Sequence, residues 1–558
     1  KNPSTKYQAF ETVVLPQRKW PNQTLQQAPV WLSTDLRDGN QSLFEPMSVE
    51  TKINFYHELI KVGFKEIEVG FPAASDIDFQ FVRRLINENL IPDDVTIMVM
   101  TQAREDLIAK SVEAVKGAKK AIVHIYNATA PAWRDIVFNM SVEQVMQLIH
   151  RQVSYLKQIT DDIPETQWIL QYSPETFSAT ELPVALEACH VALKAWDVGP
   201  DRKVIINLPT TVENTTPNVF ADRIEWMSCN LAHRENVILS VHPHNDRGTG
   251  VATAELALLA GAQRIEGCLF GNGERCGNVD IVTLALNLYT QGIHPQLDFS
   301  NINRVAQTVE KATQLPIHPR HPYVGDLVFT AFSGSHQDAI KKGLVRQKDS
   351  ALWLVPYLPI DPQDLGRTYE SVIRVNSQSG KGGIAYLLER DFGIVMPRRL
   401  QVEFSAEVQK VTDATEAEVS SKELYALFEN IYLLPPATND GWVYHTHHIT
   451  EQNNRQVVLL TLHNGLEKVQ IEGVGNGPLE AVMNALGLPI EIIHFEERSI
   501  GSGTQAKAIA VIEMMNEQGF SRHGAGIDSN ITKASIKAIF SAFNRLGLKL
   551  NFEVVADV

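Results

Sequence analysis

The tripeptide His242-Pro243-His244 ends an apolar run at residues 237–241. Residues i and i+2 of an extended strand point to the same side, so both imidazoles can reach one divalent metal ion from one face. Taken alone, the pattern also fits a strand end with two solvated histidines. The position of this strand in the fold decides between the two interpretations.

Eight short runs rich in apolar and β-branched residues alternate with helix-like segments. They cover residues 30–32, 66–69, 95–100, 121–126, 168–172, 204–207, 237–241 and 264–269. One helix is expected between Ser48, an N-cap residue, and Gly63, which follows its last turn. Eight βα units in succession predict an α/β fold, the (β/α)8 TIM barrel. A doubly wound open sheet is the competing fold, but no glycine fingerprint follows the first run.

Barrel enzymes build their sites from the loops after the carboxyl ends of the strands. Polar side chains at these ends are Arg37, Asp38, His124, Tyr126, Ser173, Glu175, Thr210, Thr211, His242, His244 and Asn278. An aspartate, two histidines and an amide form a mixed nitrogen and oxygen set. Such a set suits Mg²⁺, Mn²⁺, Co²⁺ or Zn²⁺ and leaves positions open for substrate.

The composition indicates a multidomain enzyme of the cytoplasm. A chain of 558 residues is too long for a single hydrophobic core, and 44% of the residues are hydrophobic. The net charge of −15 argues against a nucleic-acid partner. There is no apolar run of about 18 residues and no signal core at the start, so neither a membrane nor export is expected. The four cysteines have no paired spacing, which favours reduced thiols.

Four segments are expected along the chain. They are an N-terminal extension at 1–28, the barrel at 29–300, linker subdomains at 301–428 and a last α+β domain at 429–558. The last domain contains an internal repeat, each copy reading strand, strand, glycine turn and helix. The Gly-x-Gly sequences at 473–477 and 501–503 lack the βαβ context of a dinucleotide site, and taken alone they fit tight turns.

Five longer motifs resemble the 2-isopropylmalate synthase family of metal-dependent, Claisen-condensing barrel enzymes. They are LRDGNQS at 36–42, HPHND at 242–246, GNGERCGN at 271–278, FSGSHQD at 332–338 and VPYLPIDP at 355–362. The resemblance extends from about residue 20 to the C-terminus. Many relatives have Glu at the position of Asn40. An Asn there resembles the longer-chain class of the leucine-pathway enzyme. This departure argues against the homocitrate and citramalate synthases, which are the nearest alternatives.

The resemblance implies a condensation of acetyl-CoA with 2-oxoisovalerate that yields 2-isopropylmalate and CoA. The metal ligands would be Asp38, His242 and His244, with Asn278 as fourth ligand or close neighbour. Mg²⁺ is the expected ion, Mn²⁺, Co²⁺ and Zn²⁺ are alternatives, and K⁺ is an expected activator. The other implied roles are alkoxide stabilisation by Arg37, carboxylate binding by Ser173 and Thr211, and a side-chain pocket lined by His124 and Tyr126.

The resemblance also implies an acid/base pair, Glu175 and His336, supported by Tyr357, and leaves open which of the pair is the base. Without the resemblance, Glu175 fits an acidic residue in the first turn of a helix, and His336 fits an ordinary turn. Because His336 lies outside the barrel, a homodimer with domain exchange is expected. Leucine is the expected inhibitor, with contacts at Gly477, Leu479, Ala506 and Ala508.

Two other classes of protein compete with the synthase. Barrel hydrolases of the amidohydrolase type also carry a His-x-His, but on the first strand, whereas here it follows the seventh. A non-catalytic sensor of leucine or metal would explain the repeat and would leave the polar rim of the barrel unexplained.

Overall fold

The chain is described here from a computed structural model. It describes residues 2–7, 9–330, 334–347, 352–369, 381–415, 419–434, 442–463, 468–501, 506–548 and 550. These residues form two compact units. The first comprises Lys1–Ile317 and Gly343–Thr368, and the second His318–Lys342 and Tyr369–Val558.

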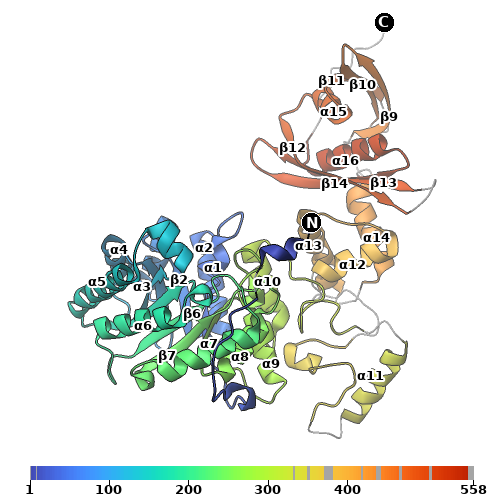
Figure 1. Ribbon diagram of the computed structural model, residues 1–558. Coiled ribbons are helices and arrows are strands. Elements are labelled where there is room, and N and C mark those ends of the chain that lie inside the picture. Colours follow the sequence, from blue (N-terminus) through green and yellow to red (C-terminus); the bar gives the residue numbers. More distant parts are fainter. Residues whose placement is uncertain are drawn as a thin grey trace. The chain divides into compact units, whose positions relative to one another are not determined.

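The first unit contains a closed barrel of eight parallel strands that follow one another in chain order (Figure 1). The strands are β1 (Val30–Ser33), β2 (Glu66–Gly70), β3 (Thr96–Gln102), β4 (Lys120–Ala128), β5 (Gln167–Glu175), β6 (Val204–Pro209), β7 (Val237–His242) and β8 (Arg264–Gly267). Each coincides with one of the eight predicted runs. The prediction of a TIM barrel is confirmed, and the open sheet is excluded because β1 pairs with β8.

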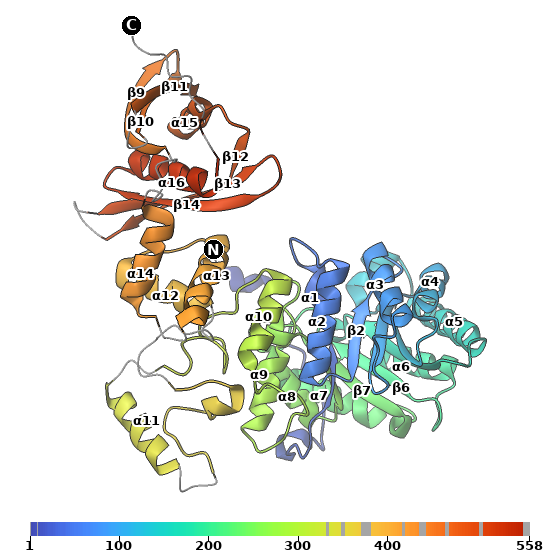
Figure 2. The same ribbon diagram turned by 180° about the vertical axis from the view of Figure 1, so that it is seen from behind.

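Helices surround the barrel (Figure 2). They are α1 (Asp38–Gln41), α2 (Val49–Val62), α3 (Asp76–Asn87), α4 (Glu105–Val115), α5 (Val142–Asp161), α6 (Leu182–Trp196), α7 (Pro217–Asn230), α8 (Gly250–Leu259), α9 (Ile281–Tyr289) and α10 (Ile302–Thr313). Helix α2 has the predicted ends. The Ser48 side chain accepts a hydrogen bond from the Thr51 amide, and Gly63 adopts a φ of 113°, a left-handed conformation that favours glycine.

Shorter helical turns join these elements. They are η1 (Pro3–Lys6), η2 (Trp20–Asn22), η3 (Trp133–Phe138), η4 (Phe177–Ala179), η5 (Arg234–Asn236), η6 (Leu269–Gly271) and η7 (Pro362–Leu365). Helix α11 (Gly334–Gln347) follows the barrel in the chain. None of the helices in the described part of the chain is long and apolar enough to span a membrane.

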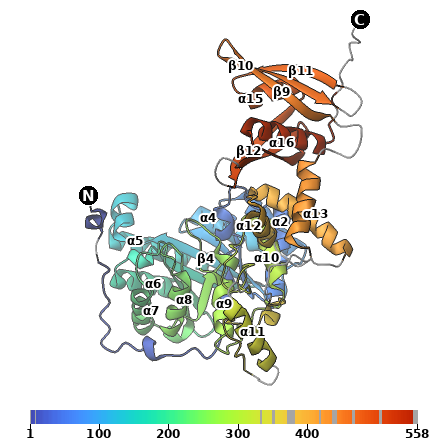
Figure 3. The same ribbon diagram turned by 90° about the vertical axis from the view of Figure 1, so that its right-hand side faces the viewer.

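Among the described residues, the second unit holds most of α11, three further helices, a helical turn and two three-stranded antiparallel sheets, each sheet followed by a helix (Figure 3). The helices are α12 (Lys381–Phe392), α13 (Arg398–Thr415), α14 (Ser421–Phe428) and η8 (Glu429–Leu433). The first half of the repeat is β9 (Val443–Gln452), β10 (Arg455–His463), β11 (Lys468–Gly475) and α15 (Pro478–Leu486). The second half is β12 (Ile490–Ile500), β13 (Lys507–Asn516), β14 (Ser521–Asp528) and α16 (Ile531–Arg545).

The predicted repeat is present, but each half has one strand more than expected. The additional strands are β9 and β12, which open the two halves. Both carry histidines and acidic residues, and neither contains a fully buried position. Their sequences therefore lack the alternation of apolar and polar residues that identifies a half-buried strand.

Four glycines of the repeat lie within strands rather than in tight turns. Gly473 and Gly475 lie within β11, against α15, and Gly524 and Gly526 lie within β14, against α16. A Cβ on Gly473 would lie 2.0 Å from the Ala481 carbonyl oxygen. These glycines let each helix approach its strand closely, at positions where a larger side chain would collide with helix backbone.

Strand β13 is buried on both faces and borders two cores. Ala510 and Ile512 belong to a core formed by both halves of the repeat with α15 and α16. Ile509 and Val511, which alternate with them, belong to a second core with α12, α13 and α14. The two faces of one strand thus join the repeat to the helices that precede it.

We expect Gly524→Ala to destabilise the second unit. The new Cβ would lie 2.2 Å from the Ala542 amide nitrogen, so helix or strand must shift. Overpacking of this kind costs about 1–3 kcal/mol. Urea denaturation followed by circular dichroism measures the loss. Gly199→Ala is the control, because a Cβ there has no heavy atom within 4 Å; equal stability of the two variants would contradict the close-packing argument.

Candidate metal centre and active site

Asp38, His242 and His244 meet at the carboxyl rim of the barrel. Their ligand atoms lie within 4.8 Å of one another, and all three residues are buried. His242 Nε2 lies 3.1 Å from Asp38 Oδ2, and His244 Nε2 lies 3.6 Å from the same oxygen. The predicted cluster therefore forms, from the loop after β1 and the end of β7.

Asn278 completes the cluster. Its Oδ1 lies 2.9 Å from His242 Nε2, while its Nδ2 donates to the Asn272 carbonyl, which turns the amide oxygen toward the histidines. Antiparallel backbone pairing of His244 with Asn278 joins the loop after β8 to the segment that directly follows β7. Oxygen atoms and imidazole nitrogens thus converge on one point, as a divalent cation requires.

Each histidine is oriented through its other ring nitrogen. His244 Nδ1 lies 2.6 Å from the Thr210 carbonyl oxygen, and a carbonyl can only accept, so Nδ1 carries the proton. His242 Nδ1 lies 2.8 Å from Glu266 Oε2 on β8. Both Nε2 atoms are left to face the cluster. Metal-binding histidines are commonly held in this way.

Arg37 lies between two carboxylates. Its Nε is 3.0 Å from Glu68 Oε1 on β2, and its Nη1 is 3.2 Å from Asp38 Oδ1. Burial alone would raise the pKa of Asp38, but the charge of Arg37 and hydrogen bonds with the two histidines hold this pKa well below its usual value. Burial dominates at Glu68 and raises its pKa to about 7 despite Arg37. Asp38 is therefore ionised at neutral pH, as a metal ligand must be.

Ser173, His124 and Asn207 form one wall of the pocket. His124 Nε2 lies 2.8 Å from Ser173 Oγ, and Asn207 Nδ2 donates to the same oxygen at 3.0 Å. Burial lowers the pKa of His124 to about 3, so this imidazole is neutral. The wall is polar and carries no net charge.

Glu175 and Thr211 line the pocket at the ends of β5 and β6. Burial raises the pKa of Glu175, although Arg37 opposes this shift. Thr211 Oγ1 accepts a hydrogen bond from the Thr176 amide at 2.8 Å, which leaves its hydroxyl proton to donate elsewhere. Tyr126, on β4, also lines the pocket, and burial raises its pKa.

Not every predicted residue belongs to this pocket. Its lining includes the predicted Arg37, Asp38, His124, Tyr126, Ser173, Glu175, Thr211, His242 and His244. Tyr357 does not line it, and 62% of its surface is exposed. His336 lies on α11, in the segment His318–Lys342 of the second unit.

The four residues expected to contact leucine lie within the repeat. Gly477 is the N-cap of α15, and Leu479 lies in its first turn. Ala506 directly precedes β13, and Ala508 lies within it. Leu479 and Ala508 pack against the same core of the repeat.

Sequence reasoning missed several residues of the site. Met100, Asn207 and Pro209 line the pocket from β3 and β6, and Gln41, Glu274 and Arg275 line its edge. Glu68 and Glu266 lie beneath it on β2 and β8, with no exposed surface. Charged residues inside short barrel strands are a signal, because burial of an unpaired charge is costly, but each of these strands also carries a second charged residue, Glu66 on β2 and Arg264 on β8.

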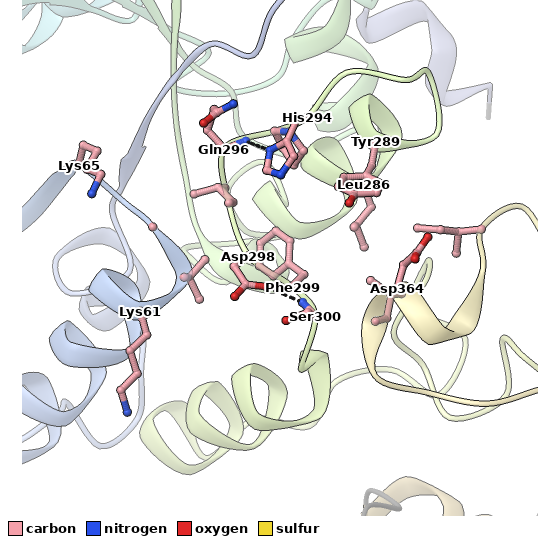
Figure 4. Close-up of a pocket in the computed structure, with 16 residues that line it drawn as sticks. Lys61, Lys65, Leu286, Tyr289, His294, Gln296, Asp298, Phe299, Ser300 and Asp364 are labelled. Atoms are coloured by element: carbon pink, nitrogen blue, oxygen red, sulfur yellow. Dashed lines mark hydrogen bonds between the residues drawn. The ribbon is translucent and has the colours of Figure 1, made fainter. Parts of the chain in front are cut away.

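A second pocket lies at the opposite, amino-terminal end of the barrel strands (Figure 4). It lies between the end of α2, the end of α9 and residues 294–300, and includes Lys61, Tyr289 and His294. Lys65 at its border pairs with Asp94 at 2.5 Å. This pocket contains none of the predicted site residues.

The fold and the site together define a barrel enzyme with a candidate metal centre at its carboxyl rim. Family models match three parts of the chain: HMGL-like at residues 28–309, alpha-isopropylmalate synthase, post-catalytic domain-like, at 326–389, and the LeuA allosteric (dimerisation) domain at 418–547. These matches span the barrel, the connecting segment and the repeat.

Full-length relatives are similar across the whole chain. The 2-isopropylmalate synthase of Herbaspirillum seropedicae (strain SmR1) is 59% identical over 98% of this chain and 98% of its own length. That of Paraburkholderia xenovorans (strain LB400) is 57% identical, over 99% and 96%. That of Pseudomonas putida (strain W619) is 56% identical, over 98% and 98%. The chain belongs to the 2-isopropylmalate synthase family.

We expect His242→Ala and His244→Ala to abolish binding of Mn²⁺ while leaving the fold intact. Each change removes a ligand at the rim, outside the barrel core. Calorimetry of chelator-treated protein measures the binding, and circular dichroism checks the fold. His190→Ala is the control, because His190 lies on α6, outside the cluster. Normal Mn²⁺ affinity in both rim variants would refute the ligand assignment.

Proposed function

We propose that the chain condenses acetyl-CoA with 2-oxoisovalerate and water, in a metal-dependent reaction that yields 2-isopropylmalate and CoA. The observation that supports this most is the convergence of Asp38, His242 and His244 beside Arg37, in a chain whose full-length relatives carry the synthase name. Family membership sets aside the hydrolase and the non-catalytic sensor. A thiol-release assay across a panel of 2-oxo acids tests the proposal.

The ligand cluster fits a divalent cation, with Mg²⁺ as the expected ion. Asp38 supplies a charged oxygen, Asn278 a neutral one, and both histidines direct Nε2 toward them. When bound, the cation would act as a Lewis acid on the carbonyl group of the oxo acid. Arg37 lies against Asp38 and would stabilise negative charge that develops on the carbonyl oxygen.

Two hydroxyl groups are placed to hold the carboxylate of the oxo acid. Thr211 Oγ1 already accepts a hydrogen bond from a backbone amide, so its proton can be given to the substrate. Ser173 Oγ accepts from Asn207 and can give its proton to the substrate when His124 Nε2 is protonated. The neutral imidazole of His124 and the Tyr126 ring would border the branched side chain. One methylene is worth about 1–3 kcal/mol in such a pocket, so weak turnover of neighbouring 2-oxo acids is expected.

Acetyl-CoA must lose a proton from its methyl group before the carbon–carbon bond forms. Glu175 is suited to accept it, because a carboxyl group with a raised pKa is a stronger base than an exposed one. His336 would act as the other member of the acid/base pair, with Tyr357 in support. A water molecule then hydrolyses the thioester and releases CoA.

The repeat is proposed to bind leucine as a feedback inhibitor in a domain-exchanged homodimer. The match of residues 418–547 to the LeuA allosteric (dimerisation) domain supports both parts of this proposal. Gly477, Leu479, Ala506 and Ala508 would provide contacts. Leu479 and Ala508 already border one core, so a small aliphatic ligand would extend an apolar surface there.

We expect Glu175→Gln to lower kcat by about 10²–10⁴, the usual contribution of general acid–base catalysis. The change keeps the size of the side chain and removes its basicity. The KM for the oxo acid should stay near its original value, since Thr211 and the metal cluster hold that substrate. Steady-state kinetics give both constants, with Glu187→Gln, at an exposed position of α6 outside the pocket, as control. Near-normal kcat with a raised KM would reassign Glu175 to substrate binding.

We expect Gly477→Val to abolish inhibition by leucine. Gly477 has extended backbone and no heavy atom near an added Cβ, so valine is accommodated and projects into the proposed effector site. Inhibition curves of the full chain, with Gly199→Val as control, measure the effect. Unchanged inhibition of the Gly477 variant would place the effector site elsewhere.

A further inference from the structure

A chain of charged side chains crosses the interior of the barrel beneath the metal cluster. Glu66 Oε2 lies 2.5 Å from Arg264 Nε, and Arg264 Nη1 lies 2.8 Å from Glu266 Oε1. Glu266 Oε2 then lies 2.8 Å from His242 Nδ1. Barrel interiors are normally filled by branched apolar residues, so this arrangement calls for a role.

Every bond to Glu266 favours its ionised form. Arg264 Nη1 and Gln171 Nε2 both donate to Oε1, the latter at 2.6 Å. Oε2 is therefore left for a single partner, the ring of His242. A carboxylate can only accept hydrogen bonds, so Nδ1 of His242 must carry the proton. Nε2, which faces Asp38 and Asn278, is then the ring nitrogen that would offer its lone pair to a bound cation.

We propose that Glu266 is a positioning residue for the metal centre: it fixes the tautomer and the ring orientation of His242, and so raises the affinity of the cluster for a divalent cation. This inference rests on the proposed function, since it presumes the metal. Arg264 in turn holds Glu266 in place. Its Nη1 also donates to Ser240 Oγ at 2.9 Å, and this additional bond fixes the guanidinium group.

The two ligand histidines are held by different means. His244 donates to a backbone carbonyl, that of Thr210, which no side-chain substitution can remove. His242 depends on the Glu266 side chain. The metal affinity is therefore expected to respond to substitution at residue 266, and loss of such an outer partner typically lowers metal affinity by about 10–100-fold.

The test is Mn²⁺ calorimetry on the metal-free full chain with Glu266→Gln. Glutamine keeps the size of the side chain and removes the charge that sets the tautomer. Glu66→Gln is the matched control, because Glu66 binds the same arginine and does not touch His242. We expect a fall in Mn²⁺ affinity of about 10–100-fold for Glu266→Gln and near-wild-type affinity for Glu66→Gln.

A second readout separates positioning from a general loss of structure. At saturating Mn²⁺, kcat of Glu266→Gln should return close to that of the wild type, while the apparent KM for Mn²⁺ stays raised. Equal Mn²⁺ affinity of Glu266→Gln and wild type would overturn the inference, as would an equal loss in Glu66→Gln. A wild-type chain that binds no Mn²⁺ would instead refute the proposed metal-dependent function.

Glu266→Asp covers the case in which the glutamine variant does not fold. Aspartate keeps the charge for Arg264 and shortens the reach to His242 by one methylene. We expect reduced Mn²⁺ affinity with an unchanged melting temperature of the metal-free protein. Wild-type affinity in this variant would overturn the inference in the same way.

Discussion

Charge inside the barrel can be kept only where each charged group has a partner, and this constraint shapes the site. An isolated ion in a dry interior costs several kcal/mol, so the charged side chains of Arg37 and Asp38 require counter-charges nearby. Glu68 serves Arg37 from β2, and Arg264 balances the acidic groups below. Lys52 of α2, which has no exposed surface, binds the Leu36 carbonyl and Asp78, and so fixes the loop that carries Arg37.

The architecture of the barrel was predictable because parallel strands are short, apolar and regularly spaced. The strand pattern placed Asp38 and His242 at one rim, although 204 residues separate them. The strand pattern did not predict which of the buried charged side chains pair with one another. The contact between Glu266 and His242 depends on the register that places β7 beside β8. That register depends in turn on closure of the barrel, which a local sequence pattern does not contain.

The repeat was harder to predict, for a physical reason. Strands β9 and β12 pair with a neighbour on one side and keep little buried surface, so their sequences carry a weak signal. The glycines of the repeat are compatible with two kinds of local structure. Glycine permits a tight turn or a close helix, and only the position of Ala481 against Gly473 decides between them. Only the family resemblance related His336 to Glu175, since no strand or helix pattern links a residue on α11 to the rim.

Helices α12, α13 and α14 pack against the second sheet of the repeat and share a hydrophobic core with it. Ile509 and Val511 of β13 are buried among these helices, and a polar network reinforces the contact. Glu403 of α13 binds His523 of β14 at 2.8 Å and Arg545 of α16 at 2.5 Å. Separating buried, paired charges is costly, and a closely packed core does not deform continuously. A change in the repeat that displaces β13 must therefore displace α13 with it, so the proposed effector would act on the preceding helices through direct contacts.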